Sequence, residues 1–177
     1  MRGEFGCETK DQAKAELGIP AGEKLVVSVW GSLGAGHMNE VLTEMIPMLD
    51  GRQGFRLLHA AGSRPSRVMT AADLVMCRAG ASTISELCYM GKPVIIVPSP
   101  NVTNNHQEKN ARVLEAAGGA KVLLEGEFDA QSLLADVKEL LADDEKLKAM
   151  SAAMTSLAAE DATERICGII LDTIHKE

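Results

Sequence analysis

Five apolar runs of strand length, separated by segments with helical spacing, constrain the fold of this chain more than any other feature. The run "KLVVSVW" at Lys24–Trp30 is β-branched and nearly continuous, which is typical of a strand buried on both faces. The other runs are Phe55–Ala61, Asp73–Cys77, Pro93–Pro98 and Ala120–Glu125. Strands that alternate with helices form parallel sheets with right-handed crossovers. The pattern therefore predicts an α/β fold with a doubly wound parallel sheet.

The predicted helices lie between and after these runs. One follows the first strand and has Pro47 near its end, one runs from Ser82 to Met90, and one runs from Asn105 to Ala117. After the last strand the pattern is helical only. "DATE" at Asp161–Glu164 resembles a capping box with Asp161 as the cap, so it predicts a final helix that runs through Ile174. We expect the apolar face of that helix to pack on the core of the domain, and the alternative is an exposed face that supports weak self-association; its residues are Ile166, Ile169, Ile170 and Ile174.

Length, charge and composition narrow the class of protein. The 177 residues fit a single domain, which we take as 1–177, and the formal net charge of −7 argues against a nucleic-acid surface. Aromatic residues are too scarce for base-stacking platforms. The four cysteines lie far apart without CxxC spacing, so a zinc site is not expected and two of them read as buried apolar residues. These features predict a cytoplasmic α/β domain.

A glycine-rich turn, "GSLGAG" at Gly31–Gly36, directly follows the first predicted strand. Ligands of open parallel sheets bind at the carboxyl ends of the strands, and free amides at a helix N-terminus attract phosphate oxygens. The turn matches neither a P-loop nor the GxGxxG fingerprint. Alone it is weak evidence, because a tight turn occurs in any α/β protein.

Hydroxylated residues and a carboxylate cluster after the third predicted strand, in "RAGASTISEL". A helix that begins near Ala81 places Ser82 and Thr83 where backbone amides lack helical partners, and Glu86 one turn later can accept hydrogen bonds from a ribose diol. The alternative is that Ser82 merely caps the helix and Glu86 is a solvated charge.

The polar stretch "PSPNVTNNHQEKNA", Pro98–Ala111, follows the fourth predicted strand and holds amide and imidazole side chains. Such groups suit the neutral hydroxyls of a sugar. Taken alone, this stretch is equally consistent with a capped surface loop. Three polar loops at one sheet edge together favour a ligand with phosphates, a ribose and a sugar.

The motifs "GSLGAG", "ADLVMCRAGASTISEL", "GKPVIIVPSP", "NNHQEKNARVLEAAGGA" and "DATERI" resemble, in order, the C-terminal half of the MurG family of bacterial peptidoglycan GlcNAc transferases. The resemblance implies the Rossmann-like, donor-binding half of a GT-B glycosyltransferase. That family adds GlcNAc from UDP-GlcNAc to lipid I, making lipid II, at the cytoplasmic face of the plasma membrane. The implied diphosphate contacts are Arg2, Ser32, Gly34 and Ala35; the implied nucleotide contacts are Gly80, Ala81, Ser82, Thr83 and Glu86; the implied GlcNAc contacts are His106, Gln107 and Asn110.

The resemblance also implies what is missing. The family's acceptor-binding N-terminal domain is absent, and with it a catalytic base; His37 begins a helix and is not a replacement. A helix and strand with uracil contacts are missing near the junction of Arg64 and Pro65. No motif demands a metal or another cofactor. We expect UDP-GlcNAc binding, little turnover without the acceptor half, and weak self-association.

Two other functions stay open at this point. The chain is also consistent with the donor-binding subunit of a two-subunit lipid-linked GlcNAc transferase. The other alternative is a scaffold domain that no longer binds nucleotide.

Overall fold

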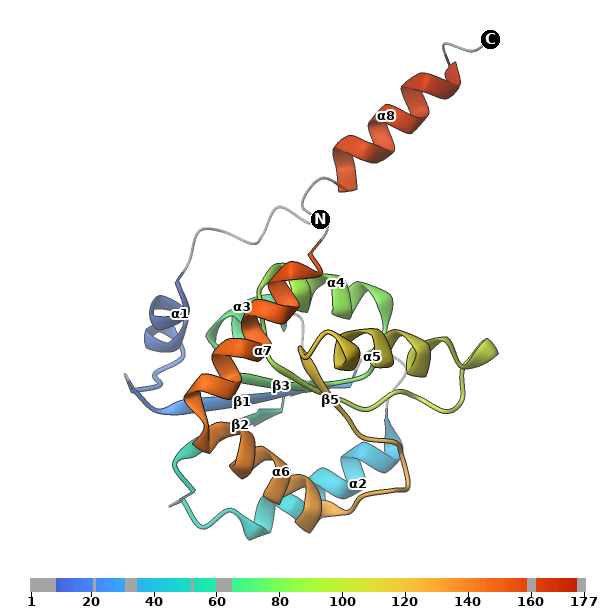
Figure 1. Ribbon diagram of the computed structural model, residues 1–177. Helices are drawn as coiled ribbons and strands as arrows, with labels where there is room; N and C mark the ends of the chain where they lie inside the picture. Colours follow the sequence, from blue (N-terminus) through green and yellow to red (C-terminus); the bar gives the residue numbers. More distant parts are fainter. Residues whose placement is uncertain are drawn as a thin grey trace.

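A five-stranded parallel sheet with helices on both faces forms the body of the protein, as the alternating pattern predicts (Figure 1). The computed structural model describes residues 9–20, 22–30, 35–51, 53–59, 65–158 and 162–174. The strand order is β2-β1-β3-β4-β5, and every neighbouring pair is parallel. The strands are β1 Lys24–Val29, β2 Phe55–His59, β3 Leu74–Cys77, β4 Val94–Ile96 and β5 Ala120–Val122.

The helices alternate with the strands and then continue alone at the C-terminal end. They are α1 Lys10–Glu16, α2 Gly36–Met45, α3 Pro65–Ala71, α4 Ala81–Tyr89, α5 His106–Ala116, α6 Ala130–Ala142, α7 Asp144–Ser156 and α8 Ala162–Ile174. Two 3₁₀ turns, Ile46–Met48 and Thr103–Asn105, adjoin α2 and α5. Pro47 lies in the first of these turns, so it ends the helix as expected. Among the described residues, no helix has the length and apolar character needed to cross a membrane.

Two apolar cores cover the two faces of the sheet. Side chains of α2 and α6 pack on one face with Val26, Trp30 and Met76, and side chains of α1, α3, α4 and α5 pack on the other with Val27 and Cys77. Helix α7 contributes to both cores, and Figure 1 shows it running from α6 towards α4. Because β1, β3 and β4 are covered on both sides, their sequences are apolar without alternation.

The observed strands are shorter than the apolar runs, and the limits have physical causes. Pro93 has no N–H to donate to a ladder, so β4 begins at Val94. Asp73 lies just before β3, which begins at Leu74. Its side-chain carboxylate accepts a hydrogen bond from the Leu25 amide at 2.7 Å, in the place of a backbone carbonyl. Helix α1 was not predicted, although Thr9 and Gln12 form a capping box at its start.

The cysteines confirm the sequence interpretation where they are described. Cys77 and Cys88 are buried, and burial raises the pKa of the Cys77 thiol to about 12. Such a thiol is inert, so these two cysteines act as small apolar residues of the core. Cys167 is exposed on α8, and Cys7 lies outside the described residues.

The packing predicted for the last helix is wrong. Helix α8 has the expected range, but its apolar side chains lie exposed, and Figure 1 shows the helix apart from the sheet and its covering layers. Ile166 and Ile169 keep 58% and 66% of their surface accessible. The described core on the side of α4 and α5 is formed with residues of α1, α3 and α7, and no residue of α8 belongs to it. The predicted cap, Asp161, lies outside the described residues.

Candidate functional site

The N-terminus of α4 presents open backbone amides at the carboxyl edge of the sheet. Gly80 is the N-cap, and no side chain caps the helix. The first amide with a helical acceptor is that of Ile84, which donates to the Gly80 carbonyl at 2.9 Å. The preceding amides, from Ala81 to Thr83, therefore have no helical partner. The alternative interpretation of Ser82 as a cap is wrong, since this side chain is exposed and makes no capping bond.

Glu86 lies one turn into α4, next to these open amides. Its side chain is half-buried, and among the described residues its carboxylate has no hydrogen-bond or ion-pair partner. The neighbouring hydroxyl of Ser85 is occupied, because it donates to the Ala81 carbonyl at 3.0 Å. A half-buried carboxylate without a partner is costly in isolation, so its geometry favours a role as an acceptor for ligand hydroxyls.

The loop after β4 turns back through two residues in the left-handed region before α5 begins. Asn104 and Asn105 have φ values of 56° and 51°, a conformation that asparagine tolerates better than most residues. This turn ends the 3₁₀ segment and directs α5 to start at His106. The doubled asparagine was read from the sequence only as a polar stretch, and its role in the backbone is visible only here.

Each of the three predicted sugar contacts has one polar atom engaged and another available. The Ser99 amide donates to Oε1 of Gln107 at 3.0 Å, which leaves the Nε2 amino group to donate. The Thr103 carbonyl accepts from Nδ1 of His106 at 2.9 Å, so the neutral ring presents Nε2 as an acceptor. Asn110 donates through Nδ2 to the Ala79 carbonyl at 3.4 Å, which links α5 to the residues just before α4. The structure thus brings the second and third polar loops together.

Arg78 holds these two loops in place, and the sequence interpretation gave it no role. Its Nη1 donates to Oε2 of Glu125 at 2.6 Å and to the carbonyls of Val97 and Pro98, both at 3.3 Å. The pair is mostly buried, with 12% and 17% of the two side chains exposed. The signal that could have revealed it is an arginine that directly follows a buried strand, where a lone charge needs a partner.

A cavity of about 280 Å³ lies between α4 and α5 beside this site. Its lining residues are Ala81, Ile84, Ser85, Cys88, Asn110, Val113, Leu114 and Leu157. Two of the predicted ligand contacts, Ala81 and Asn110, therefore share one hollow. This confirms that the two elements are neighbours, whereas no described contact joins Glu86 to Gln107 directly.

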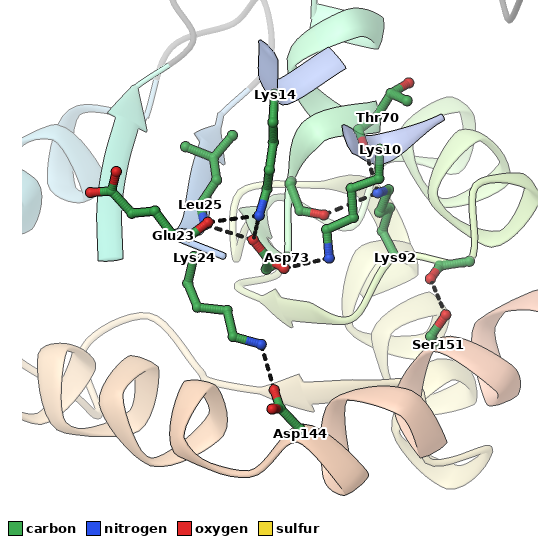
Figure 2. A network of polar contacts seen from close by, with 12 residues as sticks. Lys10, Lys14, Glu23, Lys24, Leu25, Thr70, Asp73, Lys92, Asp144 and Ser151 are labelled. Carbon is green, nitrogen blue, oxygen red and sulfur yellow. Dashed lines mark hydrogen bonds and ion pairs between the residues drawn. The ribbon is translucent and has the colours of Figure 1, made fainter. Parts of the chain in front are cut away.

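A larger hollow, of about 460 Å³, lies at the opposite, amino-terminal edge of the sheet. Figure 2 shows the polar network that borders it: Asp73 pairs with Lys10 and Lys14, and Lys24 pairs with Asp144. Lys92 donates to the carbonyls of Thr70 and Ala72, just where α3 ends. These charged groups pair with one another and with backbone carbonyls, so they stabilise the fold at this edge. The carboxyl edge of the sheet therefore remains the candidate ligand site.

The diphosphate contacts expected from the sequence are only partly within the described structure. Ala35 is the buried N-cap of α2, which has no side-chain cap. Arg2, Ser32 and Gly34 lie outside the described residues.

Residues 65–166 match the glycosyltransferase family 28 C-terminal domain. The chain belongs to this family. A relative in Acetivibrio thermocellus, the UDP-N-acetylglucosamine--N-acetylmuramyl-(pentapeptide) pyrophosphoryl-undecaprenol N-acetylglucosamine transferase, is 38% identical over 202 residues; the match covers 100% of this chain and 55% of the relative. The transferase 1 of the same description in Bacillus cereus is 34% identical, with 93% and 52% covered. The chain therefore spans about half the length of the curated relatives it matches.

Solved structures confirm the Rossmann-like fold. The crystal structure of Acinetobacter baumannii MurG has a TM-score of 0.73 and 23% identity, and the match covers 90% of this chain and 53% of that one. The spinosyn rhamnosyltransferase SpnG has a TM-score of 0.61 and 17% identity, with 87% and 47% covered. In each case the present chain matches about half of a longer glycosyltransferase.

Proposed function

We propose that this chain is the UDP-GlcNAc-binding domain of a family 28 hexosyltransferase that transfers GlcNAc to lipid I to form lipid II. The observation that carries the proposal is that the uncapped N-terminus of α4 is followed, one turn later, by the Glu86 carboxylate, which has no partner among the described residues. Open amides and a ribose acceptor side by side suit a nucleoside diphosphate. The activity for which the relatives are named suggests the donor and the lipid-linked acceptor.

The geometry supports the donor-binding roles that we propose. Gly80, Ala81, Ser82 and Thr83 present amides and hydroxyls to the nucleotide, and Glu86 accepts from the ribose. On the other side, Gln107 donates and His106 accepts at the GlcNAc hydroxyls, with Asn110 holding α5 against the loop before α4. The proposed contacts to the diphosphate are Arg2, Ser32, Gly34 and Ala35.

The chemistry proposed for this domain is stabilisation of the departing UDP. Helix N-terminal amides and an arginine stabilise the negative charge that develops on the diphosphate, so the proposal requires no metal ion and no other cofactor. The acceptor hydroxyl needs a base, and we assign none to this chain. The parent enzyme then acts at the cytoplasmic face of the plasma membrane, with the lipid-linked acceptor bound by its other half.

The domain proposal treats residues 1–177 as one UDP-sugar-binding unit that is shortened near Arg64 and Pro65. The 202-residue alignment is longer than the 177-residue chain, so the Acetivibrio relative contains segments that this chain lacks. This supports the shortening without locating it. Weak self-association stays a prediction, and the absence of nucleic-acid partners stays an expectation from the acidic charge.

Calorimetric titration with UDP-GlcNAc, UDP and UDP-glucose tests the proposal. Losing a hydrogen-bonded carboxylate contact costs roughly tenfold or more in affinity, so Glu86→Ala should weaken all three ligands. Gln107→Ala should weaken UDP-GlcNAc but leave UDP unchanged. The matched controls are Glu44→Ala and Gln131→Ala, which remove exposed side chains of α2 and α6, outside α4 and α5.

The result that overturns the proposal is an absence of UDP binding at millimolar ligand. In that case the chain is a scaffold domain. If UDP binds and Glu86→Ala and Glu44→Ala behave alike, the nucleotide does not occupy α4.

A further inference from the structure

A buried hydroxyl interrupts the apolar interior of β1. Ser28 is fully buried, while its neighbours along the strand from Leu25 to Val27 are apolar and equally buried. A buried hydroxyl needs a hydrogen-bond partner, and Ser28 finds it on the adjacent strand. Its Oγ lies 2.8 Å from Nδ1 of His59, and the two residues are also paired in the β1–β2 register. The pair is therefore a specific polar contact between β1 and β2.

The position of this pair is the carboxyl edge of the sheet. His59 is the last residue of β2, and Ser28 is the last residue but one of β1. Alternation along the strand places Ser28 on the same face as Val26 and Trp30, the face that α2 covers. The His59 side chain remains exposed although its Nδ1 is engaged. An exposed imidazole therefore stands at the edge where ligands of such sheets bind.

Helix α2 supplies open amides at the same edge. Its first helical bond runs from the Asn39 amide to the Ala35 carbonyl at 2.9 Å, and no side chain caps the amides that precede it. The indole Nε1 of Trp30 is buried on this face without a hydrogen-bond partner. Among the described residues, the edge between β1, β2 and α2 thus presents several N–H donors without a protein acceptor, which suits an anionic ligand.

The hydroxyl of Ser28 allows the outer nitrogen of His59 to act as a donor. A hydroxyl both donates and accepts. When the ring is neutral, Ser28 can donate to Nδ1, and Nε2 then carries the proton. When the ring is charged, Ser28 accepts from Nδ1, and Nε2 again carries a proton. In both states the ring can offer an N–H group to a phosphate oxygen.

We propose that His59 donates through Nε2 to the diphosphate of the bound nucleotide sugar, and that Ser28 positions its ring. The inference rests on the proposed function and adds a residue to that site. His59 is a binding residue in this proposal, whereas Ser28 acts only through it.

The test compares the affinities of UDP and uridine by calorimetry for the wild type, His59→Ala and Ser28→Ala. Loss of one charge-assisted hydrogen bond should weaken UDP about tenfold in His59→Ala and leave uridine within about twofold of the wild type. Ser28→Ala should show the same pattern with a smaller loss, because the ring remains but is no longer held. Arg56→Gln is the control, since it removes an exposed cation from the same strand without approaching this edge.

The outcomes separate the inference from the proposed function. If the wild type binds UDP and His59→Ala binds it equally well, the inference is wrong and the donor-domain proposal stands. If His59→Ala weakens UDP and uridine alike, His59 has a structural role and the inference is again wrong. If the wild type binds no UDP, both proposals fail. Should His59→Ala not fold, Ser28→Ala decides: an unchanged ratio of UDP to uridine affinity overturns the inference.

Discussion

Arg78 and Glu125 form an ion pair of 2.6 Å that joins the end of β3 to the segment after β5. Through the carbonyls of Val97 and Pro98, the same guanidinium also holds the residues that follow β4. Three neighbouring strands therefore share one tie at the edge where the donor is proposed to bind. The tie thus links the residues that precede α4 to those that follow β4 and β5.

The first prediction concerns this pair. Arg78→Met leaves a mostly buried carboxylate unpaired, so it should lower the free energy of unfolding by about 3 kcal/mol. Glu125→Gln should cost less, and the double variant should cost less than the sum because the two residues are coupled. Urea unfolding measures these values, and UDP-GlcNAc affinity should fall with them. Strictly additive effects would contradict the assigned coupling.

The second prediction isolates a close approach between α4 and α7. Gly91 has φ of +58°, and a Cβ there would lie 2.5 Å from Oγ1 of Thr155. Gly118 also has a positive φ, of +84°, but open space around it. Gly118→Ala should therefore cost only the backbone strain, about 1–2 kcal/mol, and Gly91→Ala about 1–3 kcal/mol more. Equal melting temperatures for the two variants would show that α7 shifts away from the new Cβ atom at no cost in stability.

The third prediction concerns acid stability. Burial raises the pKa of Asp73, but hydrogen bonds from Lys10, Lys14 and the Leu25 amide outweigh it and hold the pKa below its ordinary value of 3.8. The carboxylate thus stabilises the fold above pH 3.8, and this contribution is lost as the pH falls through the lower folded value. Asp73→Asn should cost about 3 kcal/mol near neutral pH.

The measurement for Asp73 is chemical unfolding as a function of pH. The difference between the wild type and Asp73→Asn should narrow as the pH falls below 3.8. Asp11→Asn, a change at an exposed carboxylate of the same helix–strand layer, should show no such trend. A difference that stays constant down to low pH would mean that the Asp73 charge does not stabilise the fold.

The fourth prediction concerns alkaline stability. Burial is the main cause that lowers the pKa of Lys92 from 10.5 to about 8. Repulsion from Lys10 and Lys14 contributes to the lowering of this pKa, whereas attraction by Asp73 opposes it. Between these two values the folded chain loses a proton that the unfolded chain keeps, so this lysine makes the free energy of unfolding rise with pH. Lys92→Met should remove the rise, whereas Lys109→Met, at an exposed position of α5, should retain it. Parallel pH curves for the wild type and Lys92→Met would contradict the shifted pKa.

The fifth prediction tests self-association through α8. Its exposed isoleucines form an apolar face without a described partner, and such a face favours contact with a second copy at high concentration. Sedimentation velocity should show a concentration-dependent increase for the wild type that Ile169→Glu abolishes. Asp172→Asn changes the charge of the same helix by one unit in the opposite direction and should leave the increase in place. A wild type that stays monomeric at every concentration would rule out this contact.

Local patterns account for what the sequence predicted correctly about the fold. β-branched runs, helical spacing and the glycines after α4 and α5 act over a few residues, so the sheet class, the alternation of strands and helices after β1 and the end of α2 near Pro47 can be predicted along the chain. The resemblance to the glycosyltransferase family is likewise carried by short motifs, and the match over residues 65–166 confirms it. The roles of individual site residues stay predictions, because they depend on a ligand.

The tertiary structure alone decided the contacts between residues far apart in the chain. Arg78 meets Glu125, Ser28 meets His59, and Asp73 meets Lys14 only because parallel strands and their crossovers bring those positions together. The exposure of α8 was likewise decided only by the tertiary structure: its periodicity marks an apolar face, but the two described cores are built from other helices. The sequence determines which helix and strand faces are apolar, and the tertiary packing determines which of these faces are buried.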